Sequence, residues 1–143
     1  MLRSEFLRTT AVAGLGALCG AACVSPLAIT GCSSGKYVDG IQGSGEISIP
    51  LSAFARRSAL IIRKNDSMQG PIHVVRSEGN AYTALSLLCT HKGCVVRPVG
   101  NSFECPCHGS EFNADGTVLS SPAQEPLMRY DVTTDATHLH IKL

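Results

Sequence analysis

The sequence predicts an all-β domain, an antiparallel sandwich or a small barrel, that follows an apolar leader and a short linker. Beyond residue 45, short apolar runs alternate with turn signals, and no segment keeps a 3.6-residue period for three turns. A chain of 143 residues has room for one domain of roughly a hundred residues and a leader. The formal net charge of +1 and the absence of any Lys/Arg run exclude nucleic acid as a partner.

Residues 1–32 are predicted to be a signal peptide or a membrane anchor. Arg3 and Arg8 precede an uncharged run, 11–30, which at helical rise would span about 30 Å, enough to cross a bilayer. Glycines and a proline make this run a poor helix, which favours a signal peptide over an uncleaved anchor. The basic residues place the start of the run in the cytoplasm in both cases.

The end of the leader carries two resemblances. Residues 29–32, Ile-Thr-Gly-Cys, resemble a bacterial lipoprotein box, which implies cleavage before Cys32 and lipidation of Cys32. Residues 3–8 resemble a twin-arginine export signal, except that Ser4 stands where the second arginine is expected. Residues 33–45 are rich in Gly and Ser and predict a flexible linker, because this composition buries too little apolar surface to order itself.

The domain itself is predicted to run from residue 46 to residue 143. Alternating or apolar runs bounded by turn residues predict strands at 46–50, 59–63, 72–76, 82–87, 95–99, 102–104, 127–132 and 138–143. Gly100-Asn101 and Asp115-Gly116 predict tight turns.

Two short motifs, Cys-Thr-His-Lys-Gly-Cys at 89–94 and Cys-Pro-Cys-His-Gly-Ser at 105–110, concentrate the soft ligands of the domain. A hairpin between them would fold the two motifs side by side. Three chemical interpretations compete: structural disulfides with incidental histidines, a zinc site with two Cys and two His, and an iron–sulfur cluster. The matched histidines argue against disulfides alone, and the spare cysteines argue against zinc. The remaining histidines of the domain are predicted not to be ligands: His73, His138 and His140.

Together the two motifs resemble the cluster-binding boxes of Rieske proteins, the [2Fe–2S] subunits of respiratory and photosynthetic quinol-oxidising complexes. The resemblance is close over about residues 82–126. It implies a Rieske-type antiparallel β-sandwich with an inserted cluster-binding subdomain at about 86–123, and one [2Fe–2S] cluster per chain.

The same resemblance implies a role for each ligand-type residue. Cys89 and Cys105 would bind one iron, and His91 and His108 the other. The remaining pair would form a disulfide between Cys94 and Cys107. Ferredoxin-like Rieske domains of dioxygenase systems lack this extra pair, so the resemblance is to the respiratory type, as in the cytochrome bc and b6f complexes. A disulfide needs an oxidising compartment, which agrees with the leader and implies a bacterial cell membrane with the domain on its periplasmic or extracellular side.

The implied function is electron transfer. Two ferric irons, two sulfides and two thiolates sum to zero charge, so the cluster accepts an electron at about −150 to +300 mV, against about −400 mV for plant-type ferredoxins. The resemblance implies electron transfer from a quinol to a cytochrome, with cytochrome b and a c-type cytochrome as partners. The chain would be a subunit of a quinol–cytochrome c reductase type of oxidoreductase rather than a catalyst alone. The alternative is a lipid-tethered carrier, or the small Rieske subunit of an oxidase such as arsenite oxidase.

Further residues are expected to set the potential and the docking surface. In the family, a serine at the position of Ser110 donates a hydrogen bond to the cluster, and His108 contacts the quinol. Phe112 stands where high-potential members carry a tyrosine, which implies an intermediate potential suited to menaquinol. Pro122 lies in a segment that resembles the proline loop covering the cluster. Lys92 replaces a leucine common in quinol-oxidising members, and either favours an acidic partner or is a solvated loop charge.

Overall fold

The computed structural model describes residues 36–143, and these residues form three β-sheets with two short 3-10 helices. The prediction of an all-β domain is confirmed. The elements follow one another as β1 (Tyr37–Val38), β2 (Ile41–Gln42), β3 (Glu46–Pro50), η1 (Leu51–Phe54), β4 (Ala59–Ile62), β5 (Ile72–Arg76), η2 (Glu78–Asn80), β6 (Tyr82–Ser86), β7 (Arg97–Val99), β8 (Ser102–Glu104), β9 (Glu111–Asn113), β10 (Val118–Ser120), β11 (Arg129–Tyr130), β12 (Val132–Thr134) and β13 (His138–Lys142).

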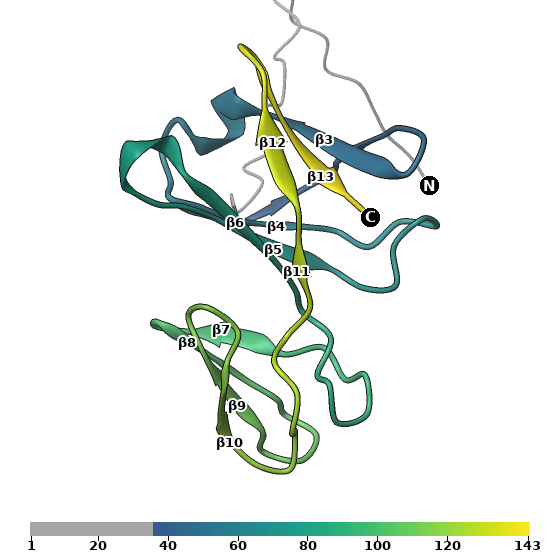
Figure 1. The fold of residues 1–143 in the computed structure, drawn as a ribbon, viewed down its shortest axis with the longest axis vertical. Coiled ribbons are helices and arrows are strands. Elements are labelled where there is room, and N and C mark those ends of the chain that lie inside the picture. The colour runs from purple at the N-terminus through teal and green to yellow at the C-terminus, as the bar shows by residue number, and fades with distance from the viewer. Residues whose placement is uncertain (1–35) are drawn as a thin grey trace, which may run out of the picture. The chain divides into compact units, whose positions relative to one another are not determined.

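The sheets are stacked as layers, with a five-stranded sheet of order β1-β4-β5-β6-β11 in the middle (Figure 1). One neighbour is the four-stranded sheet β12-β13-β3-β2, and the other is the small sheet β10-β9-β8-β7, which also has four strands but only three residues in each. All strand pairs are antiparallel except the parallel pair of β1 and β4. The small sheet is inserted between β6 and β11, which are paired with each other. The central sheet therefore holds both ends of the insertion.

The first hydrophobic core lies between the central sheet and the sheet that contains β3 and β13. Period-two alternation directs Ile47 and Ile49 of β3, and Leu139 and Ile141 of β13, inward, and all four are 0% exposed. Burying one such side chain stabilises the fold by about 1.5–3 kcal/mol. This core holds the central sheet against the sheet that contains β3 and β13, and these two sheets together form the base of the domain.

The second core lies on the opposite face of the central sheet and supports the insertion. Ile61 of β4 and Leu85 of β6 cluster there with Phe103 of β8 and Phe112 of β9. Among residues 36–143 the free cysteines are Cys89 and Cys105, and both belong to the same cluster. Apolar packing therefore extends from the base of the domain to the motif cysteines.

Most predicted strands are present, and the differences have identifiable causes. The predicted strand at 127–132 is two strands, because the chain there leaves β6 in the central sheet and continues as β12 beside β13. Strands β9 and β10 were not predicted, since each has three residues and neither directly adjoins Asp115-Gly116, whereas the equally short β8 directly follows Gly100-Asn101. The turns at Gly100 and Gly116 are present, with φ of 57° and 93°.

The expected linker at 33–45 differs from the structure over its described part. Tyr37–Val38 pairs with β4, and Ile41–Gln42 pairs with β3. A Cβ atom at Gly40 would collide with Ile47, so this glycine allows close packing rather than flexibility. The strand edges of β3 and β4 thus order a segment whose composition alone suggested a coil.

Residues 1–35 lie outside the described part of the chain. The predicted signal peptide or anchor at 1–32, the lipidation of Cys32 and the first residues of the linker all fall there. Within residues 36–143, no helix has both the length and the apolar character needed to cross a bilayer.

Candidate metal centre

The two motifs form loops with the same backbone hydrogen bonds. In the first loop, the N–H of Cys89 donates to the carbonyl of Cys94 at 2.8 Å, and the N–H of Gly93 donates to the carbonyl of Cys89 at 2.7 Å. In the second loop, the N–H of Cys105 donates to the carbonyl of Ser110 at 2.8 Å, and the N–H of Gly109 donates to the carbonyl of Cys105 at 3.0 Å. Each loop therefore closes on its first cysteine.

Each loop is held at its base by strand pairing. Leu88 and Val95 form an antiparallel bridge below the first loop, and Glu104 pairs with Glu111 below the second. Gly93 has a φ of 70° in the left-handed region, where a side chain would be strained. This accounts for a glycine at the same place in both motifs, since Gly109 has a φ of 77°.

The thiols of Cys89 and Cys105 lie at the inner end of the site, 2% and 3% exposed. Burial raises the pKa of the Cys89 thiol, but hydrogen bonds from the His91 N–H, the Cys105 thiol and the Ser110 hydroxyl outweigh it and lower the pKa below its ordinary value. Donors around a sulfur favour the thiolate, which is the form that binds metal.

The two imidazoles lie at the outer end of the site. The rings of His91 and His108 are 4.8 Å apart between centroids and inclined at 86°. The Nδ1 atom of His91 is buried and has no hydrogen-bond partner among residues 36–143. Burial and the nearby His108 and Lys92 lower the pKa of His91, which favours the neutral, ligating form. His108 is exposed.

A disulfide between Cys94 and Cys107 joins the two loops, with a Cα–Cα distance of 6.5 Å. The pairing implied by the resemblance is confirmed. The sulfur of Cys105 lies within 4.8 Å of both disulfide sulfurs. Those two sulfurs are bonded to each other and offer no thiolate, so the sulfur donors available to a metal are Cys105 and Cys89.

A proline-containing segment at 121–126 is hydrogen-bonded to both loops. The hydroxyl of Ser110, 0% exposed, accepts a hydrogen bond from the N–H of Ala123 at 3.0 Å. The hydroxyl of Thr90 donates to the carbonyl of Glu125 at 2.6 Å. Pro122 is half-buried beside Ala123. The hydrogen bond from Thr90 to Glu125 was not predicted. Its sign in the sequence is the hydroxyl side chain inside the first motif.

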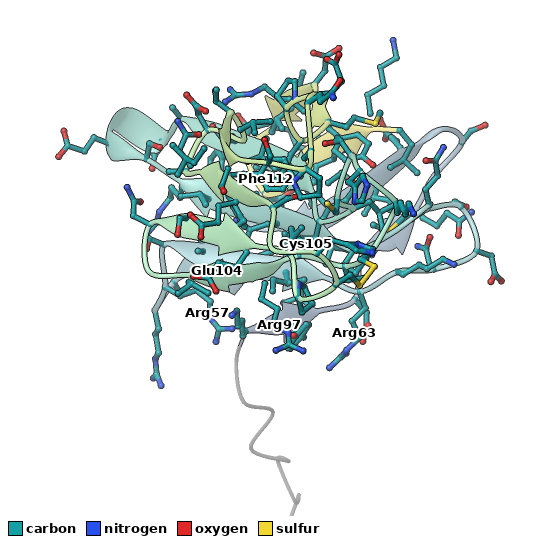
Figure 2. The ribbon with its side chains drawn as sticks, turned by 90° about the horizontal axis from the view of Figure 1, so that it is seen from below. Arg57, Arg63, Arg97, Glu104, Cys105 and Phe112 are labelled. Atoms are coloured by element: carbon teal, nitrogen blue, oxygen red, sulfur yellow. A yellow bond between two sulfur atoms is a disulfide. The ribbon has the colours of Figure 1, made fainter. Side chains whose placement is uncertain are left out.

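The two departures from the family pattern occupy different environments. Phe112 on β9 is 0% exposed and lies opposite Phe103 of β8. Figure 2 shows Phe112 and Cys105 within the body of the domain, whereas the side chain of Arg97 extends outward. Lys92 is exposed within the first loop. Phe112 can thus affect the interior of the site, and Lys92 its outer surface.

The donor set fits a [2Fe–2S] cluster with mixed ligation. Two buried thiols and two imidazoles are the ligands of a Rieske centre, and the partnerless Nδ1 of His91 is a buried polar atom that a metal would satisfy. Tetrahedral zinc accepts the same donors. The choice between the two metals therefore needs information beyond the donor set.

Comparison with known proteins supplies that information. Residues 57–131 match the model of the Rieske [2Fe–2S] domain. A cytochrome b6-f complex iron-sulfur subunit from Synechococcus sp. (strain JA-3-3Ab) is 32% identical over 114 residues, which cover 75% of this chain and 66% of that protein. The subunit of the same name from Chlorobaculum thiosulfatiphilum is 42% identical over 59 residues, 40% of this chain and 33% of that protein.

A solved structure agrees in fold. The cyanobacterial plasma membrane Rieske protein PetC3 from Synechocystis PCC 6803 superposes with a TM-score of 0.55 at 30% identity, covering 66% of this chain and 95% of that one. The matches to the curated subunits span a third to two thirds of their lengths. The matched family model covers both ligand loops, the disulfide and the proline-containing segment. The chain belongs to the Rieske [2Fe–2S] domain family.

Proposed function

We propose that this chain is an electron-transfer protein that takes electrons from a quinol and passes them to a cytochrome. Its cluster is held by the thiolates of Cys89 and Cys105 and the imidazoles of His91 and His108. The observation that carries the proposal is the difference in exposure between the two kinds of ligand: the thiols are buried, while His108 is exposed. A substrate can therefore reach an imidazole but not a sulfur.

The exposed imidazole of His108 suits a quinol, which must lose protons as well as electrons. An imidazole bound to ferric iron through one ring nitrogen loses the proton of the other more readily, and that deprotonated nitrogen can accept a hydrogen bond from the quinol hydroxyl and then its proton. The cluster, when bound, supplies a one-electron acceptor at about −150 to +300 mV. The exposed side chain of His108 is then where a quinol hydroxyl would meet this acceptor.

Residues that contact the site suggest a potential in the middle of that range. Ser110 is buried with its hydroxyl close to the sulfur of Cys89, and it can donate a hydrogen bond there. Phe112 offers no hydroxyl where high-potential members have one. One donor instead of two stabilises the reduced cluster less, so menaquinol is a better-matched reductant than ubiquinol.

The proposed partners are cytochrome b and a c-type cytochrome in a complex of the bc or b6f type. Support comes from the relatives, which are named cytochrome b6-f complex iron-sulfur subunits.

The proposed location is a bacterial cell membrane, with the domain on the periplasmic or extracellular side. The disulfide supports an oxidising compartment. The proposed attachment is through residues 1–32, either as an anchor or through lipidated Cys32, and the chain would act as one subunit of an oxidoreductase.

A second candidate is an independent electron carrier, or the small subunit of an oxidase such as arsenite oxidase. Exposed Lys92 favours it, because a charge in the first loop weakens docking against an apolar quinol site and favours an acidic partner. The substitution Lys92→Leu separates the two candidates. It should speed reduction of the cluster by quinol at a cytochrome b site, and slow electron exchange with an acidic partner.

The experiment uses the full chain in membranes of its own host. Affinity purification in mild detergent is expected to retain haem b and haem c, and added menaquinol is expected to produce the EPR signal of the reduced cluster. A preparation that carries the cluster but no haem, and is not reduced by menaquinol or ubiquinol, would contradict the quinol role and leave the second candidate.

A further inference from the structure

A cleft of about 640 Å³ separates the central sheet from the inserted sheet. One wall is the outer face of β4, β5 and β6, including Ala59, Val75 and Thr83. The other wall is the β7–β8 hairpin, including Pro98 and Phe103. Its volume is within the range of sites that bind small molecules, about 300–1,000 Å³. None of its lining residues is a proposed cluster ligand.

A buried histidine lies in the cleft without a partner. His73 on β5 is 8% exposed, and none of the described residues makes a hydrogen bond to its Nδ1. Its ring contacts the ring of Phe103 edge-on, with centroids 5.2 Å apart. Burial and the positive charge of Lys36 lower the pKa of His73 to about 4, so the ring is neutral at pH 7. Because Nδ1 is closed off from solvent, Nε2 is the ring nitrogen that a ligand in the cleft could reach, and Nε2 carries the proton of the neutral ring when Nδ1 does not.

The cleft has a positive character. Lys36 and Arg129 both line it. Its lining carboxylate, Asp115, is engaged in its own turn, where it accepts hydrogen bonds from the N–H and the hydroxyl of Thr117 at 2.8 and 2.6 Å. Arg129 donates to the carbonyl oxygen of Asp115, not to its carboxylate. The carboxylate of Asp115 keeps its charge and interacts with Arg129, which leaves the positive charge of Lys36 without a carboxylate of its own among the lining residues.

The lining of the cleft combines hydrogen-bond donors with apolar surface. Hydroxyl groups are supplied by Ser58, Ser77, Thr83 and Ser102. Apolar surface is supplied by Val75, Pro98 and Phe103. Such a lining suits a molecule with an apolar body and one oxyanion group.

We propose that this cleft is a binding site for a small organic anion, whose oxyanion group is bound by Lys36 and by the ring N–H of His73. The apolar body of the ligand packs against Val75, Pro98 and Phe103. Because one wall belongs to the central sheet and the other to the inserted sheet, the ligand bridges the base of the domain and the part that carries the cluster loops. This site is additional to the proposed electron-transfer function and does not depend on it.

The test uses the cluster-loaded full chain and the fluorescent probe 8-anilinonaphthalene-1-sulfonate, which combines an aromatic body with one sulfonate. The expected result is one saturable site that benzoate displaces. Lys36→Ala and His73→Leu should each weaken binding at least fivefold, because each removes a donor to the oxyanion. Lys64→Ala, which removes an exposed lysine outside the cleft, should leave binding unchanged.

A second measurement, of the unfolding temperature, distinguishes loss of binding from a folding defect in the His73→Leu variant. Benzoate should raise the unfolding temperature of the unaltered chain and of the Lys64→Ala variant, but not that of Lys36→Ala, whose exposed side chain is not needed for the fold. The proposal is overturned if the probe binds Lys36→Ala as tightly as it binds the unaltered chain. It is equally overturned if binding is not saturable or if benzoate leaves the unfolding temperature unchanged.

Discussion

Replacing Ser110 with alanine should lower the reduction potential of the cluster. The hydroxyl of Ser110 is 0% exposed and accepts a hydrogen bond from Ala123, which leaves its own proton free to point toward the sulfur of Cys89. Reduction adds negative charge to the cluster, so this donor stabilises the reduced form more than the oxidised form. Removing the donor therefore makes electron uptake less favourable.

The expected size of the shift follows from one hydrogen bond to a charged acceptor. Such a bond contributes about 1.5–3 kcal/mol. For a one-electron couple, a tenfold change in the equilibrium constant, about 1.4 kcal/mol, corresponds to about 59 mV. The potential of Ser110→Ala should fall by at most about 130 mV, the limit that applies if the bond stabilises the reduced form alone. The variant should also be less stable by about 1–3 kcal/mol, because the buried N–H of Ala123 loses its acceptor.

Ser86→Ala is the matched control for this prediction. Ser86 is 4% exposed, and its hydroxyl accepts a hydrogen bond from the N–H of Leu88 at 3.2 Å. Like Ser110, it is therefore a buried serine that accepts a hydrogen bond from a backbone N–H. Potentials are measured by redox titration followed by EPR. Ser86→Ala should lose stability without a shift in potential. An unchanged potential in Ser110→Ala, or an equal shift in both variants, would refute the reasoning.

Three further predictions concern the interior of the site, the disulfide and a surface histidine. Phe112→Tyr should raise the potential by supplying a hydroxyl donor, and an unchanged redox titration would contradict the role given to this position. Replacing both Cys94 and Cys107 with alanine should lower the free energy of unfolding by about 3 kcal/mol, the entropic value for a loop of about 15 residues, since the two are 13 apart in sequence; an unchanged urea midpoint would count against it. Hydrogen bonding to Asp135 raises the pKa of His140 above 6.5, so its stabilising effect is complete below pH 6.5 and is lost as the pH rises through the raised value. His140→Gln should therefore flatten the decline in urea midpoint above pH 6.5, whereas the neighbouring change His138→Gln should keep it.

Local sequence signals were enough to predict the ligand loops. Glycine at 93 and at 109 marks a left-handed turn, and the hairpin between the loops was visible as two short strands around Gly100-Asn101. These features depend on residues close together in the chain. The same is true of β3, β5 and β8, whose bounds agree with prediction because their alternation or turn residues are distinct.

Features that depend on distant contacts could not be predicted. Residues 37–42 are ordered because they pair with the free edges of β3 and β4. From the sequence alone Gly40 suggests flexibility, whereas in the structure it packs closely against Ile47. The hydrogen bond from Thr90 to Glu125 joins segments far apart in sequence. Within the described residues, the buried Nδ1 of His73 lacks a hydrogen-bond partner because of the strands that surround it, and composition does not reveal which strands these are.

The most direct test of the account is pulsed EPR of the dithionite-reduced full chain, with detection of nitrogen nuclei coupled to the cluster. Ligation by His91 and His108 predicts the rhombic signal of a reduced Rieske centre with two strongly coupled nitrogens, and loss of that signal in His91→Ala with Ser110→Ala retaining it. A cluster signal without coupled nitrogens, or an EPR-silent protein containing one zinc ion, would contradict the assignment of the metal centre.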